Sequence, residues 1–485
     1  MTTDFERILL HLRHMEPYEK LIAYGRVMLF YGDYSCLEPP TPLPPLFMLD
    51  NVNYSARVVA DPLPMSSIIE AFDLAPGYGS ITGDYELGPV VRGLERFRAS
   101  RYAARHVPPS LAADGSAIDG MVVLTTAGAT GAAHTILGAA MTRDRATART
   151  PRTKVVFNTP CYTLPDGFAQ MRGLRSVPVL GRSEHGFMPS VDAIIDAIDG
   201  ETLACFLTFP TNPSLQSFRA SDVPALARLV EHCQRSGVWL VADAVFQDLQ
   251  WGDEPSPEIF AVAKSSAYLA KLQSPSKDRP FACGYRTGYL VADRTLEPWL
   301  NGVEALTKNS SSTQNHVWLA LDSVFRMARG RGRLDPELFE PIVGRFIFGY
   351  GASELSAAEM HGRALPLYAH YAKAVDAFEA SLRAEIERIH RWLSESTCFE
   401  AAPLPAFGNI VLAKVRPPFD AEGDEDRYFL ETLIETNVAT TVGGCFGMSP
   451  REGVWIRVAA GGAPADEIIG ALARVEACRR RRAGR

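Results

Sequence analysis

Short apolar runs alternate with longer helical stretches between residues 119 and 293, and this alternation limits the possible folds more than any other feature. The runs are MVVLTT, KVVFNTP, LACFLTFP, VWLVADAV, SAYLAKLQ and GYLVAD. Between the first four lie 20 or more residues with helical periodicity, such as PALARLVEHCQRSG. Uninterrupted apolar runs indicate strands that are buried on both faces, and the intervening helices supply the crossovers. The pattern therefore predicts an α/β domain with a mostly parallel sheet.

The segments on either side of this region have a different sequence pattern. The chain begins with a helical stretch and continues into the proline-rich CLEPPTPLPPL, which excludes a helix and favours an extended arm. After about residue 325 it is first loop-rich and charged, then helical from about 364 to 394, and it ends with the strand-like NIVLAKV and VWIRVAA and a last helix. We predict an N-terminal arm that joins a small domain (1–70), a large domain (71–325) and a smaller α+β domain (326–485) with an insertion near 328–362.

Composition and charge exclude several classes of protein. The 485 residues are 47% hydrophobic and carry a net charge of −7, so there is no basic surplus for binding nucleic acid. The basic cluster Arg479–Arg482 is typical of a solvated, frayed helix end. No signal peptide and no run of about 18 apolar residues is evident, so we expect a cytoplasmic protein without a membrane span.

Cysteine and histidine spacing predicts no metal site. The eight cysteines are scattered singly, without a Cys-x-x-Cys motif. His11 and His14 have no carboxylate or cysteine in register, which favours a surface position over a ligand role.

Ligands bind at the carboxyl ends of parallel strands in open α/β sheets, so the residues after each apolar run are candidate site residues. AGATGAA follows the first run, and its small residues suit either an anion at a helix N-terminus or simply a tight turn. Tyr162 follows the second run. Asn212 follows the third, where an Asn-Pro bond in the cis form would fix the asparagine. Asp243 follows the fourth, where a buried carboxylate needs a cationic partner.

One lysine lies just beyond the fifth run. The chain has only eight lysines, and Lys277 follows two serines and precedes Arg286 in SPSKDRPFACGYR. Arginine keeps its charge, whereas a lysine amine loses its proton in a suitable pocket and attacks a carbonyl. Singly, each of these residues has a structural explanation. In this order, however, a phosphate cradle, an aromatic ring, an asparagine, an aspartate and a lysine are the parts that hold pyridoxal phosphate (PLP).

These motifs resemble the class I/II aminotransferase family of fold type I PLP enzymes, over residues 75 to 320 and the C-terminal strands. The resemblance implies a large domain with a seven-stranded, mainly parallel sheet and a smaller α+β domain built from both ends of the chain. It also implies PLP as cofactor, an amino-acid substrate, and a homodimer with shared active sites.

The resemblance also assigns roles to individual residues. Lys277 corresponds to the Schiff-base lysine, Asp243 to the partner of the pyridine nitrogen and Tyr162 to the aromatic that stacks on the ring. Asn212 corresponds to the residue that bonds the cofactor's phenolic oxygen close to the substrate. The residues that match the phosphate cup are Ala129, Thr130, Ser274, Ser276 and Arg286.

Two further residues are implied to contact the substrate. Arg457, within VWIRVAA, resembles the arginine that clamps the substrate carboxylate in a bidentate pair. Tyr85, in GDYELGPVVR, resembles a catalytic tyrosine that reaches the active site of the neighbouring subunit.

Three features depart from the family pattern. Phe246 occupies the position, three residues after the aspartate, of a cofactor-contacting tyrosine that donates to the phenolic oxygen, and loss of this donor should raise the pKa of the Schiff base. Leu215 replaces the glycine usual after the Asn-Pro turn, and Arg286 lies nine residues after Lys277, one further than expected. These departures weigh against routine transamination more than against cofactor binding.

The chemistry shared by the family leaves the reaction open. An amino acid displaces Lys277 to give an external aldimine, the freed amine takes the α-proton, and the ring stabilises the Cα carbanion. The details GDYELGPVVR, AGAT and SKD resemble aminocyclopropane-carboxylate synthases, which act on S-adenosylmethionine. We therefore expect β- or γ-elimination, replacement or carbon–carbon bond formation on S-adenosylmethionine or a similar amino acid in specialised metabolism. The alternatives are an ordinary class I/II aminotransferase and a non-catalytic regulatory protein that kept the fold.

Overall fold

Seven strands form a mixed sheet in the order β2-β8-β7-β6-β5-β3-β4. They are β2 (Met121–Thr126), β3 (Lys154–Thr159), β4 (Arg175–Leu180), β5 (Thr202–Thr208), β6 (Trp239–Asp243), β7 (Leu269–Gln273) and β8 (Gly288–Asp293). Neighbouring strands run parallel except at β8, which is antiparallel to both β2 and β7. The predicted seven-stranded, mainly parallel sheet is confirmed. The computed structural model describes residues 3–29, 46–49, 52–55, 57–58, 60–74, 87–307, 313–349 and 355–484.

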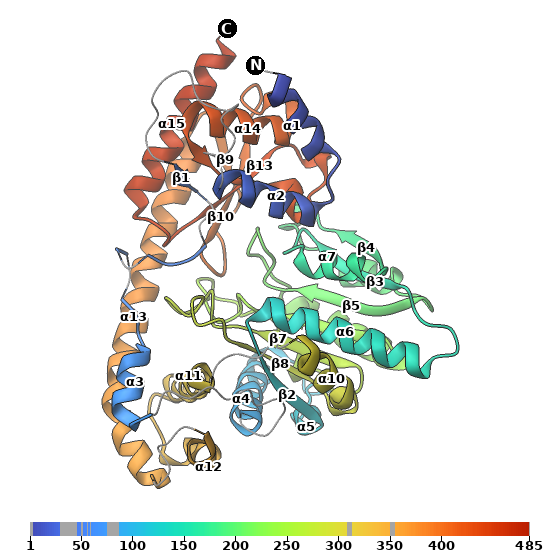
Figure 1. Cartoon of the computed structure of the whole chain (residues 1–485), viewed down its shortest axis with the longest axis vertical. Helices are drawn as coiled ribbons and strands as arrows, with labels where there is room; N and C mark the ends of the chain where they lie inside the picture. Colours follow the sequence, from blue (N-terminus) through green and yellow to red (C-terminus); the bar gives the residue numbers. More distant parts are fainter. Residues whose placement is uncertain are drawn as a thin grey trace.

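Alternate residues of the strands pack into two cores on the two faces of the sheet (Figure 1). Val123 and Leu207 belong to the core that contains α4 (Gly88–His106), α9 (Val223–Ser236) and α11 (Thr313–Arg331). Val122 and Phe206 belong to the core that contains α6 (Ala129–Thr147) and α10 (Glu297–Thr307). Because helices cover both faces, six of the strands are buried at every residue.

A smaller α+β part is built from both ends of the chain (Figure 1). Its antiparallel sheet has the order β12-β13-β10-β9, and β1 pairs with β11. These strands are β1 (Phe47–Met48), β9 (Phe399–Ala401), β10 (Ile410–Val415), β11 (Val438–Ala439), β12 (Thr441–Val442) and β13 (Trp455–Ala459). The helices around them are α1 (Thr3–Arg13), α2 (Pro17–Leu29), α14 (Glu425–Thr436) and α15 (Ala465–Ala483). This arrangement matches the smaller domain that the resemblance implied.

One long helix, α13 (Ala357–Glu395), runs along both parts (Figure 1). Tyr371 and Val375, in its first half, pack into the core of the large part, whereas Phe378 and Leu382 pack into the core of the small part. Before it, α12 (Glu340–Gly349), within the region expected to be an insertion, packs Ile342 onto the large core. We therefore propose that the domain boundary lies within α13 rather than at residue 326.

The C-terminal arginines differ in part from expectation. Arg479 is buried, and its guanidinium donates to Glu431 Oε2 at 2.8 Å and to the Tyr428 carbonyl at 2.7 Å. Arg480 and Arg482 pair with carboxylates of α15 and α14. The interpretation as a solvated, frayed helix end was therefore wrong for Arg479, whose charge is matched by Glu431 of α14, whereas Arg480 and Arg481 are exposed, as expected. In the described ranges, no helix has both the length and the apolar composition needed to cross a membrane.

Candidate active site

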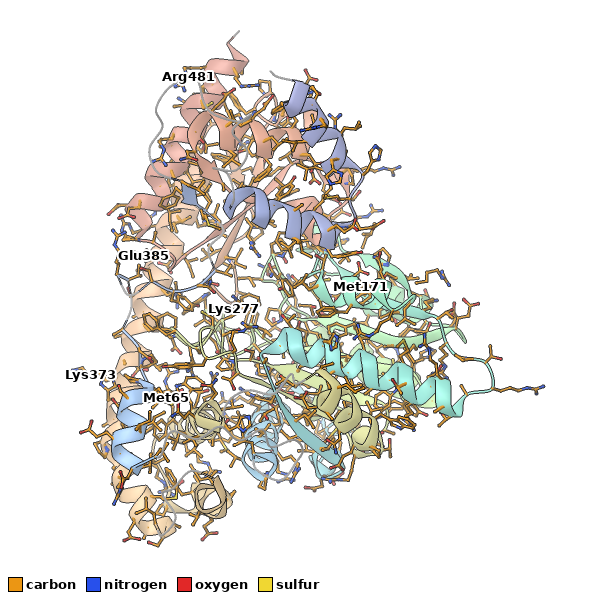
Figure 2. The ribbon with its side chains drawn as sticks, in the orientation of Figure 1. Met65, Met171, Lys277, Lys373, Glu385 and Arg481 are labelled. Atoms are coloured by element: carbon orange, nitrogen blue, oxygen red, sulfur yellow. The ribbon has the colours of Figure 1, made fainter. Side chains whose placement is uncertain are left out.

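A cavity of about 510 Å³ lies at the carboxyl end of the large sheet, where the small part meets it. Lys277 lies close to the centre of the molecule, between the two parts (Figure 2). Strand β6 ends at Asp243 on the cavity wall, and β13 of the small part contributes Arg457. The predicted site residues that line the cavity are Ala129, Thr130, Tyr162, Asn212, Asp243, Phe246, Ser276, Lys277, Arg286 and Arg457.

Lys277 has an amine suited to act as a nucleophile or base. Burial lowers its pKa to about 8, and the charges of Arg457 and Arg286 act in the same direction. Its main-chain carbonyl accepts a hydrogen bond from Tyr54 Oη at 2.6 Å. Tyr54 itself packs edge-to-face on Phe378 in the core of the small part, so both parts of the molecule fix the position of Lys277.

Asp243 is a buried carboxylate whose expected cationic partner is absent from the described residues. Its side chain is 6% exposed, and Oδ1 accepts a hydrogen bond from the Val245 N–H at 3.3 Å. Burial raises its pKa to about 7, and the Val245 hydrogen bond opposes this only partly. A ligand with a protonated ring nitrogen would supply the missing partner.

Asn212 and Arg457 meet on the wall that joins the two parts. Arg457 Nη1 donates to Asn212 Oδ1 at 3.3 Å, and the guanidinium lies over the Phe446 ring at 4.8 Å. The Asn212–Pro213 peptide bond is cis, the form considered from the sequence. With its oxygen engaged by Arg457, Asn212 keeps its NH₂ group as the donor for a ligand oxygen.

The first turn of α6 and Arg286 form a cationic end of the cavity. Gly128 precedes α6 with φ 85°, and a Cβ there would lie 3.6 Å from Arg286 Nη2. Arg286 is exposed and donates to the Ala127 carbonyl at 3.2 Å. Burial raises the pKa of the Tyr162 phenol, and the neighbouring Thr130 side chain opposes this rise. The N–H groups of a helix start and a guanidinium together suit a phosphate.

Two predicted residues do not join this cavity. Ser274 is fully buried, and its Oγ donates to the Thr287 carbonyl at 2.8 Å and accepts from the Ser276 N–H at 3.3 Å. Its hydroxyl therefore shapes the turn, and Ser274 is not among the residues that line the cavity. Tyr85 lies outside the described residues.

The two departures Phe246 and Leu215 form one apolar wall with Phe407 and Ile410. Leu215 has φ 50°, a backbone conformation that favours glycine, so the turn keeps its shape although the side chain is leucine. A Cβ at Gly408 would lie 2.6 Å from Leu215 Cδ1 and 2.7 Å from Phe246 Cδ1. Leu215 and Phe246, the two departures from the family pattern, therefore pack together against Gly408.

Sequence reasoning missed the contribution of α2. Leu21 and Ile22 line the cavity, as do Val52, Leu164, Pro165, Val245 and Cys283. Helix α2 is held on the small part by Tyr24, whose hydroxyl donates to Asp426 at 2.5 Å and whose ring stacks on Phe429 at 3.9 Å. Apolar residues on an amphipathic helix carry no signal that separates a cavity wall from an ordinary core.

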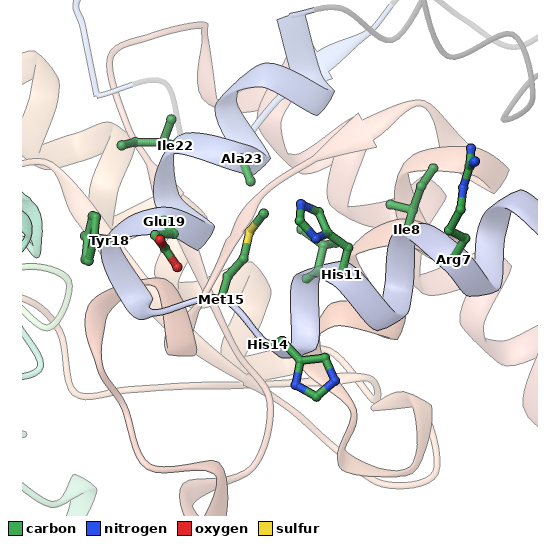
Figure 3. Close-up of a pocket in the computed structure, with 10 residues that line it drawn as sticks. Arg7, Ile8, His11, His14, Met15, Tyr18, Glu19, Ile22 and Ala23 are labelled. Carbon is green, nitrogen blue, oxygen red and sulfur yellow. The ribbon is translucent and has the colours of Figure 1, made fainter.

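A larger hollow of about 910 Å³ lies beside α1 and α2 (Figure 3). Arg7, Met15 and Glu19 are among its lining residues, and it shares Ile22 with the cavity that contains Lys277. His11 and His14 are exposed there, which agrees with the surface position expected for them. The hollow includes none of the predicted site residues.

Comparison with known proteins identifies the central part of the chain. Residues 122–331 match the family model described as aminotransferase class I and II. This segment belongs to the class I and II aminotransferase family. It spans the large sheet from β2 to β8 and ends with α11, and it includes Asp243, Lys277 and Arg286.

Curated aminotransferases resemble part of the chain. Histidinol-phosphate aminotransferase of Rubrobacter xylanophilus is 30% identical over 150 residues, which are 31% of this chain and 40% of the relative. LL-diaminopimelate aminotransferase of Nitratidesulfovibrio vulgaris is 26% identical over 148 residues, 30% of this chain and 36% of the relative. The chain thus spans no more than 40% of the length of these relatives.

Solved aminotransferase structures resemble almost the whole chain in fold. The aspartate aminotransferase of Rhizobium meliloti has a TM-score of 0.65 and 17% identity, covering 95% of this chain and 96% of that one. The aromatic aminotransferase of Pyrococcus horikoshii has a TM-score of 0.60 and 15% identity, covering 90% and 96%. At such identities the likeness shows the fold alone, which is the fold type I predicted from the sequence.

PLP, the cofactor of this family, fits the residues of the cavity. The structure offers a buried carboxylate without a cationic partner in the described chain, a cationic end and an amine with a lowered pKa. Asp243 would hold the pyridine N–H, Arg286 and the start of α6 the phosphate, and Lys277 the aldehyde carbon. Asp243, Arg286 and Lys277 thus each have a counterpart in the cofactor.

Proposed function

We propose that the protein is a PLP-dependent enzyme that acts at the Cα atom of an α-amino acid, with transamination as its reaction. The observation that carries the proposal is the meeting of Lys277 and Asp243 in one cavity, the first with its pKa lowered to about 8 and the second buried without an ion-pair partner in the described chain. The similarity to several curated aminotransferases supports transamination.

The residues around Lys277 divide the work of binding. When bound, PLP supplies an aldehyde that bonds an amine and a ring that accepts electrons from Cα. Arg457 binds the substrate carboxylate, and Asn212 offers its NH₂ group to the phenolic oxygen. Tyr162 stacks on the ring. We retain the homodimer and the role of Tyr85 in the neighbouring active site as part of this proposal.

Lys277 acts as the base that removes the α-proton. With a pKa of about 8, a substantial fraction of the amine is neutral near pH 7.5 and accepts a proton. The Arg457 and Arg286 charges that lower the pKa also hold the two anionic ends of the bound molecules, so binding and proton transfer depend on the same groups.

The second candidate reaction is elimination or replacement at the β or γ carbon, with S-adenosylmethionine as the substrate. The observation in its favour is the apolar wall of Phe246 and Leu215, which removes a hydroxyl donor from the cavity and departs from the family pattern at the site itself. Both reactions begin with the same proton abstraction by Lys277 and diverge afterwards, so the products distinguish them.

The test combines absorbance with product analysis. We expect wild-type protein with PLP to show a visible band of covalently bound cofactor, and Lys277→Ala to lose it together with at least about 100-fold of the turnover. A panel of amino acids with 2-oxoglutarate, and S-adenosylmethionine separately, then identifies the reaction. A keto acid indicates transamination, whereas release of the sulfur-containing leaving group indicates γ-chemistry.

Arg457→Ala tests the substrate end of the site. Loss of a charge-assisted pair to the carboxylate should raise KM about 10- to 100-fold for any amino acid that is turned over. If Lys277→Ala and Arg457→Ala both kept wild-type kinetics, the assignment of the site would be wrong. Absence of the band from the wild-type protein would contradict the proposed cofactor chemistry itself.

A further inference from the structure

A buried guanidinium joins the two chain segments that carry Lys277 and Asp243. Arg326 of α11 is bound by three carboxylates: Asp248 at 2.6 Å, Asp278 at 3.1 Å and, one turn earlier in its own helix, Asp322 at 2.6 Å. Asp278 directly follows Lys277, and Asp248 lies five residues after Asp243. The side chain of Arg326 is only 9% exposed.

The ion pairs continue on either side of Arg326. Asp248 also pairs with Arg98 of α4, which in turn pairs with Glu95. Asp322 accepts hydrogen bonds from Arg279 Nε at 3.3 Å and from Tyr371 Oη at 2.8 Å. The Lys277 segment is therefore held at the two residues that follow the lysine. We call this set the ionic network: Arg98, Asp248, Asp278, Arg279, Asp322 and Arg326, with Glu95, Glu258 and Lys271 at its far end.

Such a network fixes geometry more than it adds stability. Desolvation of buried ions offsets most of their attraction, so the net gain over apolar packing is small. The guanidinium, in contrast, binds carboxylates in a planar fork whose directions are set, and a carboxylate that loses this partner in the interior must move or take up a proton. Arg326 therefore restricts two separate segments to one relative position.

None of the three carboxylates or Arg326 lines the cavity that contains Lys277. The contact of the network with that cavity is through the chain: Asp278 is adjacent to Lys277, and the segment after β6 carries Val245 and Phe246 on the cavity wall before it reaches Asp248. On its other side, Lys277 is held by Tyr54 at the main-chain carbonyl. The lysine backbone is thus fixed between two anchors.

We propose that Arg326 is a positioning residue: through Asp278 and Asp248 it sets the position of Lys277 relative to Asp243. This inference rests on the proposed roles of those two residues. It assigns to Arg326 no contact with cofactor or substrate. Because the cofactor must reach both residues at once, a displacement of either segment weakens cofactor binding and slows the reaction while the substrate carboxylate site at Arg457 stays intact.

The chain offers a matched control for a purely structural role. Arg329 lies three residues further along α11 and pairs with Asp376 at 2.8 Å and with Glu379 at 2.8 Å, both on α13. It thereby joins α11 to α13 and contacts neither active-site segment through these pairs. Arg329→Gln also removes a helix–helix ion pair, but it leaves Asp248 and Asp278 with their partner.

The experiment compares wild type, Arg326→Gln, Arg326→Lys and Arg329→Gln as PLP-loaded proteins. PLP affinity is taken from the visible band, and kcat and KM are measured with an amino acid that the wild type turns over. We expect Arg326→Gln to lower kcat on the order of 100-fold with little change in KM, since small misplacements of reacting groups cost this much. PLP binding should weaken about 10-fold or more. Arg326→Lys should recover part of both losses, and Arg329→Gln should resemble wild type.

Several outcomes decide the matter. Equal losses in Arg326→Gln and Arg329→Gln, or wild-type kcat and PLP affinity in Arg326→Gln, would overturn the proposal. If Arg326→Gln does not fold, Asp278→Asn must show the drop in kcat at nearly constant KM, and Arg326→Lys must show a smaller one. If the wild type binds no PLP, the proposed function fails separately. Hydrogen exchange of the cofactor-free protein then tests the positioning: Arg326→Gln, but not Arg329→Gln, must raise exchange over residues 243–251 and 274–287.

Discussion

Two groups of buried charges adjoin the segment that carries Lys277, and they differ in how their charges are matched. In the ionic network, charges such as Arg326 and Lys271 each have two or more opposite charges within hydrogen-bonding distance. On the cavity wall, Asp243 has no ion pair within the described part of the chain, and burial holds the pKa of Lys277 at about 8. Burial is similar in the two groups. The ionic network and the cavity wall therefore differ in whether each buried charge has a partner of opposite charge.

The difference has an energetic reason. A buried charge without a partner costs several kcal/mol, which a protein retains only where a ligand supplies the missing interaction. The burial of Asp243 and Lys277 without partners is therefore unfavourable, and PLP supplies the missing interactions when it binds. In the network, each buried charge is compensated by a partner. The network fixes the position of the segments that carry Asp243 and Lys277.

The largest expected effect comes from breaking a pair in the network. Lys271 of β7 binds Glu95 at 2.6 Å and Glu258 at 2.8 Å, and all three side chains are buried. Lys271→Met leaves two carboxylates in the interior with one cation fewer, so the free energy of unfolding should fall by about 3–5 kcal/mol at pH 8. Urea denaturation of the cofactor-free protein measures it.

The loss in Lys271→Met should shrink towards pH 5, because carboxylates without their cation take up protons in the folded state. Lys264, which is exposed, provides the control: Lys264→Met should change the free energy of unfolding by less than about 0.5 kcal/mol. A loss of less than about 1 kcal/mol in Lys271→Met would show that the network tolerates an unmatched charge and would remove the contrast with the cavity wall.

Asp243→Asn should have the opposite effect on stability. The pKa of Asp243 is raised from 3.8 to about 7, so the folded protein keeps a proton that the unfolded chain releases. The contribution of this group is favourable at low pH and is lost as pH rises from about 4 to 7. Above pH 7 the variant without cofactor should be more stable than wild type by up to about 4 kcal/mol, the equivalent of this shift.

Thermal unfolding of the cofactor-free proteins from pH 5 to pH 8.5 measures this gain, which should be smaller at pH 5. Addition of PLP should stabilise wild type more than Asp243→Asn, because the variant lacks the charge that the ring nitrogen matches. Asp253→Asn, at an exposed position, is the control and should show neither effect. A variant that is less stable than wild type at pH 8 would mean that Asp243 is already paired.

Much of the fold was predictable because burial leaves a plain trace in sequence. Six apolar runs became six strands that are buried on both faces, and the helix expected from 364 to 394 lies within α13. Strand β4 was missed because it lies at the sheet edge, with most of its residues exposed or half-buried and Pro178 within it. An edge strand has one solvent-facing side, so it needs neither an apolar run nor a main-chain N–H donor at every residue.

Chain direction was enough to predict which residues lie at the cavity, whereas side-chain direction and pairing between distant residues could not be read from the sequence. The rule that strand ends meet at one edge brought Asp243 and Asn212 to the cavity. It could not tell that the Ser274 hydroxyl turns to the Thr287 carbonyl. Arg326 and Asp248 are 78 residues apart, and in sequence each is an ordinary surface charge.

The smallest expected effect tests the apolar wall of the cavity. Phe246→Tyr adds a hydroxyl to a ring on the cavity wall, at the position where the family pattern has a donor to the phenolic oxygen of PLP. The new hydrogen bond should lower the pKa of the nitrogen that links Lys277 to the cofactor, because it stabilises the phenolate once that nitrogen has lost its proton. A neutral donor contributes about 1 kcal/mol, so the shift should be below about one pKa unit in a pH titration of the visible band.

Phe407→Tyr is the control, because it adds the same hydroxyl to the same cluster but not on the cavity wall, and it should leave the titration unchanged. An unchanged titration in Phe246→Tyr would place the phenolic edge of the cofactor away from this wall.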